Sequence, residues 1–250
     1  MDWADAINVA RPHVVKIATP TGYGTGFLSF YNHDKTWCGI ATAAHVVSHA
    51  EEWQEPIRIL NDNSVRFLKI EDRVIMIDRS NDSAVVLFLK NELQLPEVPI
   101  TLTPMDQPCS IGADAGWLGY PVLASDTLCF FAGSVSARLA NRKSYLIDGV
   151  AINGVSGGPV FHSLSDGKIE IIGCVSQYHA NVATGATLPG LLYAQDVSHF
   201  HGAAETIRNI DEANAQKAEF EQKQHAAAVM EVTEAADRAA ATLVTQTKGI

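Results

Sequence analysis

A serine surrounded by glycines is the strongest chemical signal in this chain. Ser156 lies within Gly154–Pro159, between two apolar runs that are typical of strands. A nucleophilic serine needs an exposed hydroxyl on a tight turn, with backbone N–H groups beside it that can donate to the oxyanion formed when a carbonyl is attacked. Glycines permit both features. The segment therefore predicts Ser156 as a nucleophile, with an ordinary glycine-rich loop as the alternative.

A serine hydroxyl is a weak nucleophile until a base takes its proton, so a histidine has to lie nearby in the fold. Of the nine histidines, His45 follows the small residues Thr42–Ala44, which leave room beside a ring at the end of a strand. We predict His45 as the base. His199 and His201 could be two ligands on one side of a strand, but no third partner has metal spacing. Neither a metal nor a cofactor is expected.

The imidazole in turn needs a carboxylate that fixes its tautomer and stabilises the imidazolium. Asp82 immediately precedes the apolar strand-like run Ser83–Leu89. Burying a carboxylate at the mouth of such a strand is costly unless it is paired. Asp82 is therefore preferred over Asp78, which fits a solvated turn.

The elements that position these three residues read as short strands. From Val14 to Phe200, apolar runs of four to eight residues alternate with Gly, Pro, Asn and Asp, which predicts about a dozen strands in an all-β sandwich or barrel. We place a first domain at 1–201 and a C-terminal extension at 202–250.

The extension has a different composition. Ala203–Lys248 contains no Pro or Gly and is rich in Ala, Glu, Gln and Lys, which predicts one long helix or two shorter ones. Its large apolar residues do not sustain the heptads of a coiled coil. The helical segment is interpreted as docking on the barrel or as joining a homo-oligomer or partner protein, with a solvated tail as the alternative.

The three motifs TAAHVV, DSAVV and GVSGGP occur in the order His, Asp, Ser, and in this order they resemble the trypsin/chymotrypsin superfamily, especially its HtrA (Deg) branch. GYGTGFLSF, AGWLGYP, AGSVSARL and PGLLYAQDV extend the resemblance over about Val14 to Val197. It implies two packed six-stranded antiparallel β-barrels with the site in the cleft between them. The implied activity is that of a serine endopeptidase acting through an acyl-enzyme.

The resemblance also implies roles for further residues. The backbone N–H groups of Gly154 and Ser156 would form the oxyanion hole. The segment Ser176, Gln177 and Tyr178 would line the cleft and pair with an extended substrate as an added strand. Val150 would form the floor of the primary specificity pocket and would favour aliphatic side chains over Lys or Arg.

Three departures from the family pattern are visible. Val155 stands where digestive enzymes carry an aspartate, and no Ile-Val-Gly-Gly start is present, so activation by N-terminal trimming is not expected. The loop before Ser156 is one residue shorter than its HtrA-like counterpart, which leaves the resting geometry of the oxyanion hole open. No PDZ module follows the first domain.

Composition excludes several kinds of partner. A net charge of -10 argues against nucleic acid and anionic membrane surfaces. The chain has no export signal and no apolar run of about 18 residues. Its four cysteines stand alone, which predicts free thiols and a cytoplasmic location.

Two other functions are alternatives to a serine endopeptidase. One is an inactive or partner-gated scaffold with a protease fold, which would bind peptide or protein and assemble through its C-terminal helices. The other is an α/β-hydrolase esterase, whose order of Ser, acid and His does not fit the histidines of this chain.

Overall fold

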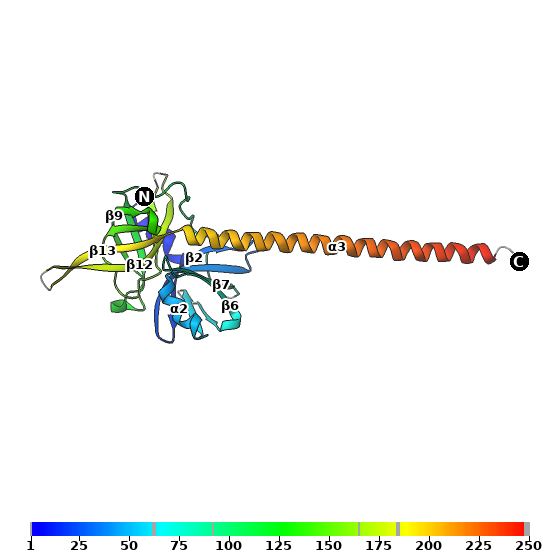
Figure 1. Ribbon diagram of the computed structural model, residues 1–250, viewed down its shortest axis with the longest axis horizontal. Helices are drawn as coiled ribbons and strands as arrows, with labels where there is room; N and C mark the ends of the chain where they lie inside the picture. Colours follow the sequence, from blue (N-terminus) through cyan, green and yellow to red (C-terminus); the bar gives the residue numbers. More distant parts are fainter. Residues whose placement is uncertain (1, 62–63, 92, 165, 184–185, 248–250) are drawn as a thin grey trace. The chain divides into compact units, whose positions relative to one another are not determined.

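The computed structural model describes the 250-residue chain except residues 1, 62–63, 92, 165, 184–185 and 248–250, and it gives no side chains for 178–190 and 237–247. The chain divides into two compact units, Met1–Glu205 and Thr206–Ile250. The larger unit contains the strands, which Figure 1 shows as arrows, and every predicted site residue has a number within its bounds.

Thirteen strands are present in the described residues. Those of the first half, with their helices, are α1 (Trp3–Ala10), η1 (Arg11–His13), β1 (Val14–Thr19), β2 (Gly22–Tyr31), β3 (Trp37–Thr42), α2 (Ala44–Glu52), β4 (Ile57–Asn61), β5 (Ser64–Leu68), η2 (Ile70–Asp72), β6 (Arg73–Asp78) and β7 (Ser83–Leu89). The second half contains β8 (Asp114–Gly119), η3 (Val122–Ala124), β9 (Cys129–Leu139), η4 (Ala140–Arg142), β10 (Ser144–Asp148), β11 (Pro159–Ser163), β12 (Ile169–Ala183), β13 (Ala186–Asp196) and α3 (Ser198–Thr247).

The first half forms a seven-stranded antiparallel sheet in the order β5-β4-β1-β2-β3-β7-β6. Its core is aliphatic, with Ile17, Leu28, Ile40, Val86 and Phe88 fully buried. The sequence predicts a closed barrel of six strands here. The sheet has seven strands, and its outer strands β5 and β6 are edges, because each pairs with one neighbour only in the described part of the chain.

The second half forms the closed six-stranded barrel that the sequence predicts, in the order β10-β13-β12-β11-β8-β9. Trp117 on β8 is fully buried in the core of this barrel and stacks on Phe131 of β9. The two ring centroids are 6.1 Å apart, a separation typical of aromatic pairs. Closure removes the exposed edges that an open sheet presents. The barrel thus gives the loop between β10 and β11, which contains Ser156, a rigid base.

Helix α3 is one continuous helix that begins at Ser198, five residues before the predicted start. The carboxylate of Asp196 accepts hydrogen bonds from the N–H and hydroxyl of Ser198, so the first turn is capped by a preceding side chain. Phe200 is fully buried and meets Phe27 edge to face at 5.7 Å. This packing offsets the roughly 1 kcal/mol that Gly202 costs inside a helix.

No helix in the described residues is both long and apolar enough to cross a membrane.

Candidate active site

His45 lies in the first turn of helix α2, whereas the sequence placed it at the end of a strand. Strand β3 ends at Thr42 and α2 begins at Ala44. The residue before the helix, Ala43, offers no side-chain cap, and the exposed amides are satisfied from another segment. Ala44 N–H donates to the carbonyl of Asp82 at 3.1 Å, and His45 N–H donates to Asp82 Oδ1 at 3.0 Å. Asp82 therefore caps the helix that carries His45.

Asp82 closes the hairpin between β6 and β7. Asp78 pairs with Ser83 as the last pair of the ladder. Asp82 has a φ of +47°, a left-handed conformation that aspartate tolerates better than most residues. Asp78, the alternative carboxylate, lies at the start of the same turn. Its carboxylate accepts hydrogen bonds from Ser80 and Asn81 and not from His45.

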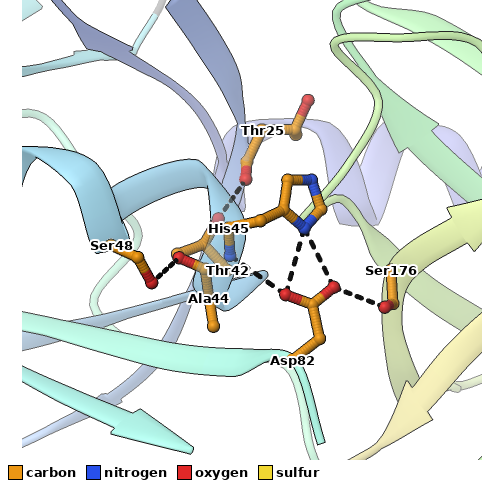
Figure 2. Close-up of polar contacts among 7 residues, drawn as sticks. All are labelled: Thr25, Thr42, Ala44, His45, Ser48, Asp82 and Ser176. Atoms are coloured by element: carbon orange, nitrogen blue, oxygen red, sulfur yellow. Dashed lines mark hydrogen bonds and ion pairs between the residues drawn. The ribbon is translucent and has the colours of Figure 1, made fainter. Parts of the chain in front are cut away.

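The carboxylate of Asp82 lies between the ring of His45 and the hydroxyl of Ser176, as Figure 2 shows. His45 Nδ1 is 2.9 and 3.0 Å from the two carboxylate oxygens, and Ser176 Oγ donates to Oδ2 at 2.5 Å. Because an ionised carboxylate only accepts, Nδ1 carries the proton and Nε2 presents its lone pair. Half of the His45 side chain is exposed, against 15% of Asp82.

The environment keeps Asp82 ionised. Burial by itself would raise the pKa of Asp82, but the hydrogen bonds from His45 and Ser176 outweigh it and hold the pKa below its usual range. The carboxylate thus remains an acceptor for the ring at neutral pH.

Ser156 faces the same cavity as this pair. A cavity of about 530 Å³ is lined by His45, Asp82 and Ser156. The other lining residues come from the loop before Ser156 and from strand β12: Ala151, Ile152, Asn153, Val175, Ser176 and Gln177. Within the described residues, no hydrogen bond joins the Ser156 hydroxyl to His45. Such bonds are often long in unliganded sites and shorten when substrate binds.

Two glycines flank Ser156 in conformations that a side chain would prevent. Gly154 and Gly157 have φ values of +93° and +85°. A Cβ on Gly157 would collide with the carbonyl of Thr25, and one on Gly154 with the carbonyl of Tyr120. The glycines beside Ser156 are therefore required by close backbone approach as well as by conformation.

The turn before Ser156 orients two free amides. Val155 N–H donates to the carbonyl of Ile152 at 3.0 Å, and Gly154 with positive φ occupies the third position, as a type II turn requires. The carbonyl of Asn153 accepts from Val122 N–H at 2.7 Å. Since the carbonyl and amide of a trans peptide unit point in opposite directions, the N–H of Gly154 points away from Val122. Neither this N–H nor that of Ser156 donates to any described residue.

Thr25 on β2 joins this turn to the first sheet. Its fully buried hydroxyl donates to the carbonyl of Gly154 at 2.8 Å and accepts from Tyr120 N–H at 3.1 Å. Its N–H donates to the carbonyl of Ser156 at 2.8 Å, and its own carbonyl accepts from Thr42 Oγ1 at 2.7 Å. Sequence reasoning missed this residue, although it lies in the GYGTGFLSF segment that carried part of the resemblance.

The residues predicted to bind substrate are divided. Ser176 and Gln177 line the cavity. Val150 does not, and its side chain is 47% exposed. Ala151 and Ile152 line the cavity instead, one and two residues further along the chain. The backbone of Tyr178 belongs to β12, but its side chain lies outside the described residues.

His199 and His201 do not converge on a common point. Nε2 of His199 contacts the carbonyl of Met76 at 3.1 Å, whereas Nε2 of His201 contacts the carbonyl of Thr103 at 3.0 Å. In the described part of the chain, no group of three His, Cys, Asp or Glu residues has the geometry of a metal site.

Comparisons with known proteins agree with this fold. The family model of the trypsin-like peptidase domain matches residues 24–173, which is more than half of the chain. The chain therefore belongs to the trypsin-like peptidase family. A search of curated proteins found no match.

Two solved structures share the fold at low sequence identity. The Rv3671c protease of Mycobacterium tuberculosis, in an inactive form, is 21% identical with a TM-score of 0.55, over 80% of this chain and 91% of that one. The serine endoprotease of Yersinia pestis is 20% identical with a TM-score of 0.58, over 83% of this chain and 66% of that one. Both structures share the fold of this chain, and together with the family match they show a fold of the trypsin/chymotrypsin type.

Proposed function

We propose that this protein is a serine endopeptidase in which Ser156 is the nucleophile, His45 the general base and Asp82 the residue that orients the ring. The observation that carries the proposal is the Asp82–His45 hydrogen bond, which leaves Nε2 as the basic nitrogen in the cavity that Ser156 also lines. Membership of the trypsin-like peptidase family supports the same chemistry.

In the proposed reaction, Ser156 Oγ attacks the carbonyl carbon of a peptide bond while its proton passes to His45 Nε2. The negative oxygen of the tetrahedral intermediate accepts hydrogen bonds from the N–H groups of Gly154 and Ser156, which have no other described acceptor. The C–N bond then breaks, and the amine leaves with the proton from His45. Water, deprotonated by His45, hydrolyses the acyl-enzyme and regenerates the hydroxyl. The chemistry requires no metal or organic cofactor.

The substrate we propose is an extended segment of polypeptide. Strand β12 pairs with β11 only as far as Cys174, and from Ser176 onward its described ladder partner is β13 alone. The free edge at Ser176, Gln177 and Tyr178 is suited to accept a peptide as an added strand. Ala151, Ile152 and Val175 give the cavity an apolar part, which favours an aliphatic side chain at the scissile bond. We assign this contact to Ala151 and Ile152 in place of Val150.

Labelling with a fluorophosphonate probe tests the nucleophile. Wild type should be labelled, and Ser156→Ala should abolish labelling while thermal unfolding stays within a few degrees of wild type. The matched control is Ser163→Ala on β11, a half-buried serine of the same barrel that does not line the cavity. Labelling that survives Ser156→Ala, or disappears in Ser163→Ala, would contradict the assignment.

The absence of a described hydrogen bond between Ser156 and His45 favours one alternative, a protease-fold scaffold that is inactive until a partner binds. A resting site of this kind would bind peptide without turning it over. Incubation of the free chain with unstructured casein separates the two ideas, because a competent endopeptidase cleaves it and a gated one does so only when a partner is added.

The location and assembly of the protein are also proposals. All four cysteines are free thiols, and burial raises the pKa of Cys38 to about 12, which suits structural cysteines in a reducing compartment such as the cytoplasm. Helix α3 exposes Phe220, Val229 and Val232, which supports self-association through this helix. Light-scattering mass of the full chain and of a chain ending at Glu205 tests it, since only the full chain should form oligomers.

A further inference from the structure

A second cavity, of about 500 Å³, adjoins the candidate active site. Gln177 lines both cavities, one residue beyond Ser176 along β12. Gln177 is also the ladder partner of Tyr193, which lines the second cavity as well, so this cavity begins at the part of β12 that the proposed peptide would join.

The charged side chains that line this second cavity are all positive. Arg142 and Lys143 line it, and no aspartate or glutamate does. Neither cation forms an ion pair with any described residue, whereas Lys16, Arg73 and Arg79 elsewhere in the chain do so. The cavity is therefore a local site of uncompensated positive charge beside a substrate cleft.

Two of the residues that line the cavity carry buried polar atoms without partners in the described part of the chain. The hydroxyl of Ser144, a residue only 1% exposed, and Oε1 of Gln195 have no hydrogen-bond partner among the described residues, and both residues line the cavity. Buried polar groups are almost always hydrogen-bonded, to protein, water or ligand. A hydroxyl can donate to a carboxylate, and an amide oxygen can accept from a peptide N–H.

The walls of the cavity are held in place before any ligand binds. Lys143 has a left-handed φ of +47°, its N–H donates to the carbonyl of Ala140 at 3.3 Å, and its own carbonyl accepts from Asp196 N–H at 2.7 Å. Ser80 and Asn81, which also line the cavity, are fixed by hydrogen bonds to the carboxylate of Asp78. Preorganised walls reduce the entropy lost when a peptide side chain is held.

We propose that this second cavity is a specificity subsite that receives an aspartate or glutamate side chain of the peptide substrate. Arg142 and Lys143 would pair with the carboxylate, and Ser144 would donate a hydrogen bond to it. The proposal rests on the proposed function, because the peptide is positioned by the cleft that holds Ser156.

The test measures binding without cleavage. Fluorescently labelled pools of extended ten-residue peptides, each with Glu or Gln fixed at one position, are bound to Ser156→Ala and followed by anisotropy. At one fixed position Glu should bind roughly fivefold more tightly than Gln, as expected for partly exposed ion pairs. The double variant Arg142→Gln with Lys143→Gln should lose this preference, and raised salt should weaken it.

Two further variants make the result specific. Lys69→Gln with Lys168→Gln removes the same charge from two lysines that do not line the cavity, and it should keep the preference for Glu. Arg142→Glu with Lys143→Glu should reverse the preference, so that Lys at the same position binds more tightly than Glu. Equal binding of Glu and Gln pools, or a preference unchanged by the first double variant, would overturn the subsite.

Hydrolysis of the same pools by the wild type separates this proposal from the proposed function. Charge-selective binding without any cleavage would contradict the endopeptidase and leave the subsite in place. Cleavage without a preference for Glu would contradict the subsite and leave the endopeptidase in place.

Discussion

In the half of the chain that forms the seven-stranded sheet, two candidate catalytic side chains contact each other directly. His45 and Asp82 share two ring-to-carboxylate contacts, and Asp82 also caps the helix on which His45 lies. In the closed barrel, by contrast, the loop of Ser156 is held mainly through its main chain, by hydrogen bonds to the backbone of Val122 and Val175. The sheet therefore orients a side chain, whereas the barrel orients amides, and the proposed chemistry uses both.

Each half also supplies a side chain that the other half requires. Thr25 extends from the sheet to the carbonyl of Gly154 in the barrel, and Ser176 extends from the barrel to Asp82 in the sheet. The difference between the halves teaches that neither contains a complete site. Substitutions in the sheet, in the barrel and at these two crossing residues should therefore have separable effects.

The largest effect is expected within the sheet, from Asp82→Asn. An amide can still cap His45 N–H through its oxygen, but its NH₂ group would face Nδ1 and favour the wrong tautomer. We expect kcat for peptide hydrolysis to fall about 10⁴-fold. The free energy of unfolding should fall by only about 1–3 kcal/mol, because the amide loses the stabilising charge of the carboxylate. Steady-state kinetics and urea unfolding measure the two quantities, and a loss smaller than tenfold would contradict the proposed role of Asp82.

Thr25→Val should break the crossing contact to the barrel. It leaves Tyr120 N–H and the Gly154 carbonyl unpaired at a fully buried position, which should cost about 1–3 kcal/mol of stability. Loosening of the Gly154 amide should lower kcat by roughly tenfold to a hundredfold, less than the loss of a whole oxyanion donor, while KM stays nearly constant. Thr25→Ser is the matched control and should restore kcat, and a fall in stability with unchanged kcat would limit Thr25 to a structural role.

Ser176→Ala should break the opposite crossing contact, with a smaller and pH-dependent effect. The pKa of Asp82 lies below its unfolded value, so the ionised carboxylate adds stability above about pH 4, and this stability is lost as pH falls through the folded pKa. Removing the Ser176 hydroxyl raises that pKa. We expect the variant to lose about 1–2 kcal/mol of unfolding free energy at pH 7, measured by urea unfolding. The difference from wild type should become smaller as the pH falls toward about 2.5. A loss independent of pH would contradict this coupling.

Asp78→Asn should have the smallest effect and sharpens the contrast with Asp82. Burial opposes ionisation of Asp78, but hydrogen bonds from Ser80 and Asn81 outweigh it and lower the pKa to about 2. Its stabilising contribution is present above about pH 4 and is lost as pH falls toward 2. Solvent screening should limit this contribution to about 1 kcal/mol. On a peptide without acidic residues, kcat should change by less than about twofold.

Much of the architecture could be predicted from local patterns. Short apolar runs between turn residues indicated the strands, and the helical character of the extension followed from its lack of Pro and Gly. The first sheet was harder to predict, because closure depends on whether the outer strands β5 and β6 meet, and no pattern within either strand records that. The start of α3 was predicted too late, at Ala203, for a similar reason, since Phe200 in its first turn is anchored by Phe27, which is far away in the sequence.

The sequence by itself determined which residues make up the candidate site: a serine between glycines, a histidine after small residues and an aspartate at the mouth of a strand, because those requirements are local. Only the tertiary structure decided that Ala151 and Ile152, and not Val150, line the cavity, and that Thr25 and Ser176 link the two halves. These contacts join residues more than ninety positions apart or depend on which face of a loop turns inward. The packing of the two halves against each other decides these contacts and the orientation of the loop, and the spacing of residues in the sequence does not specify that packing.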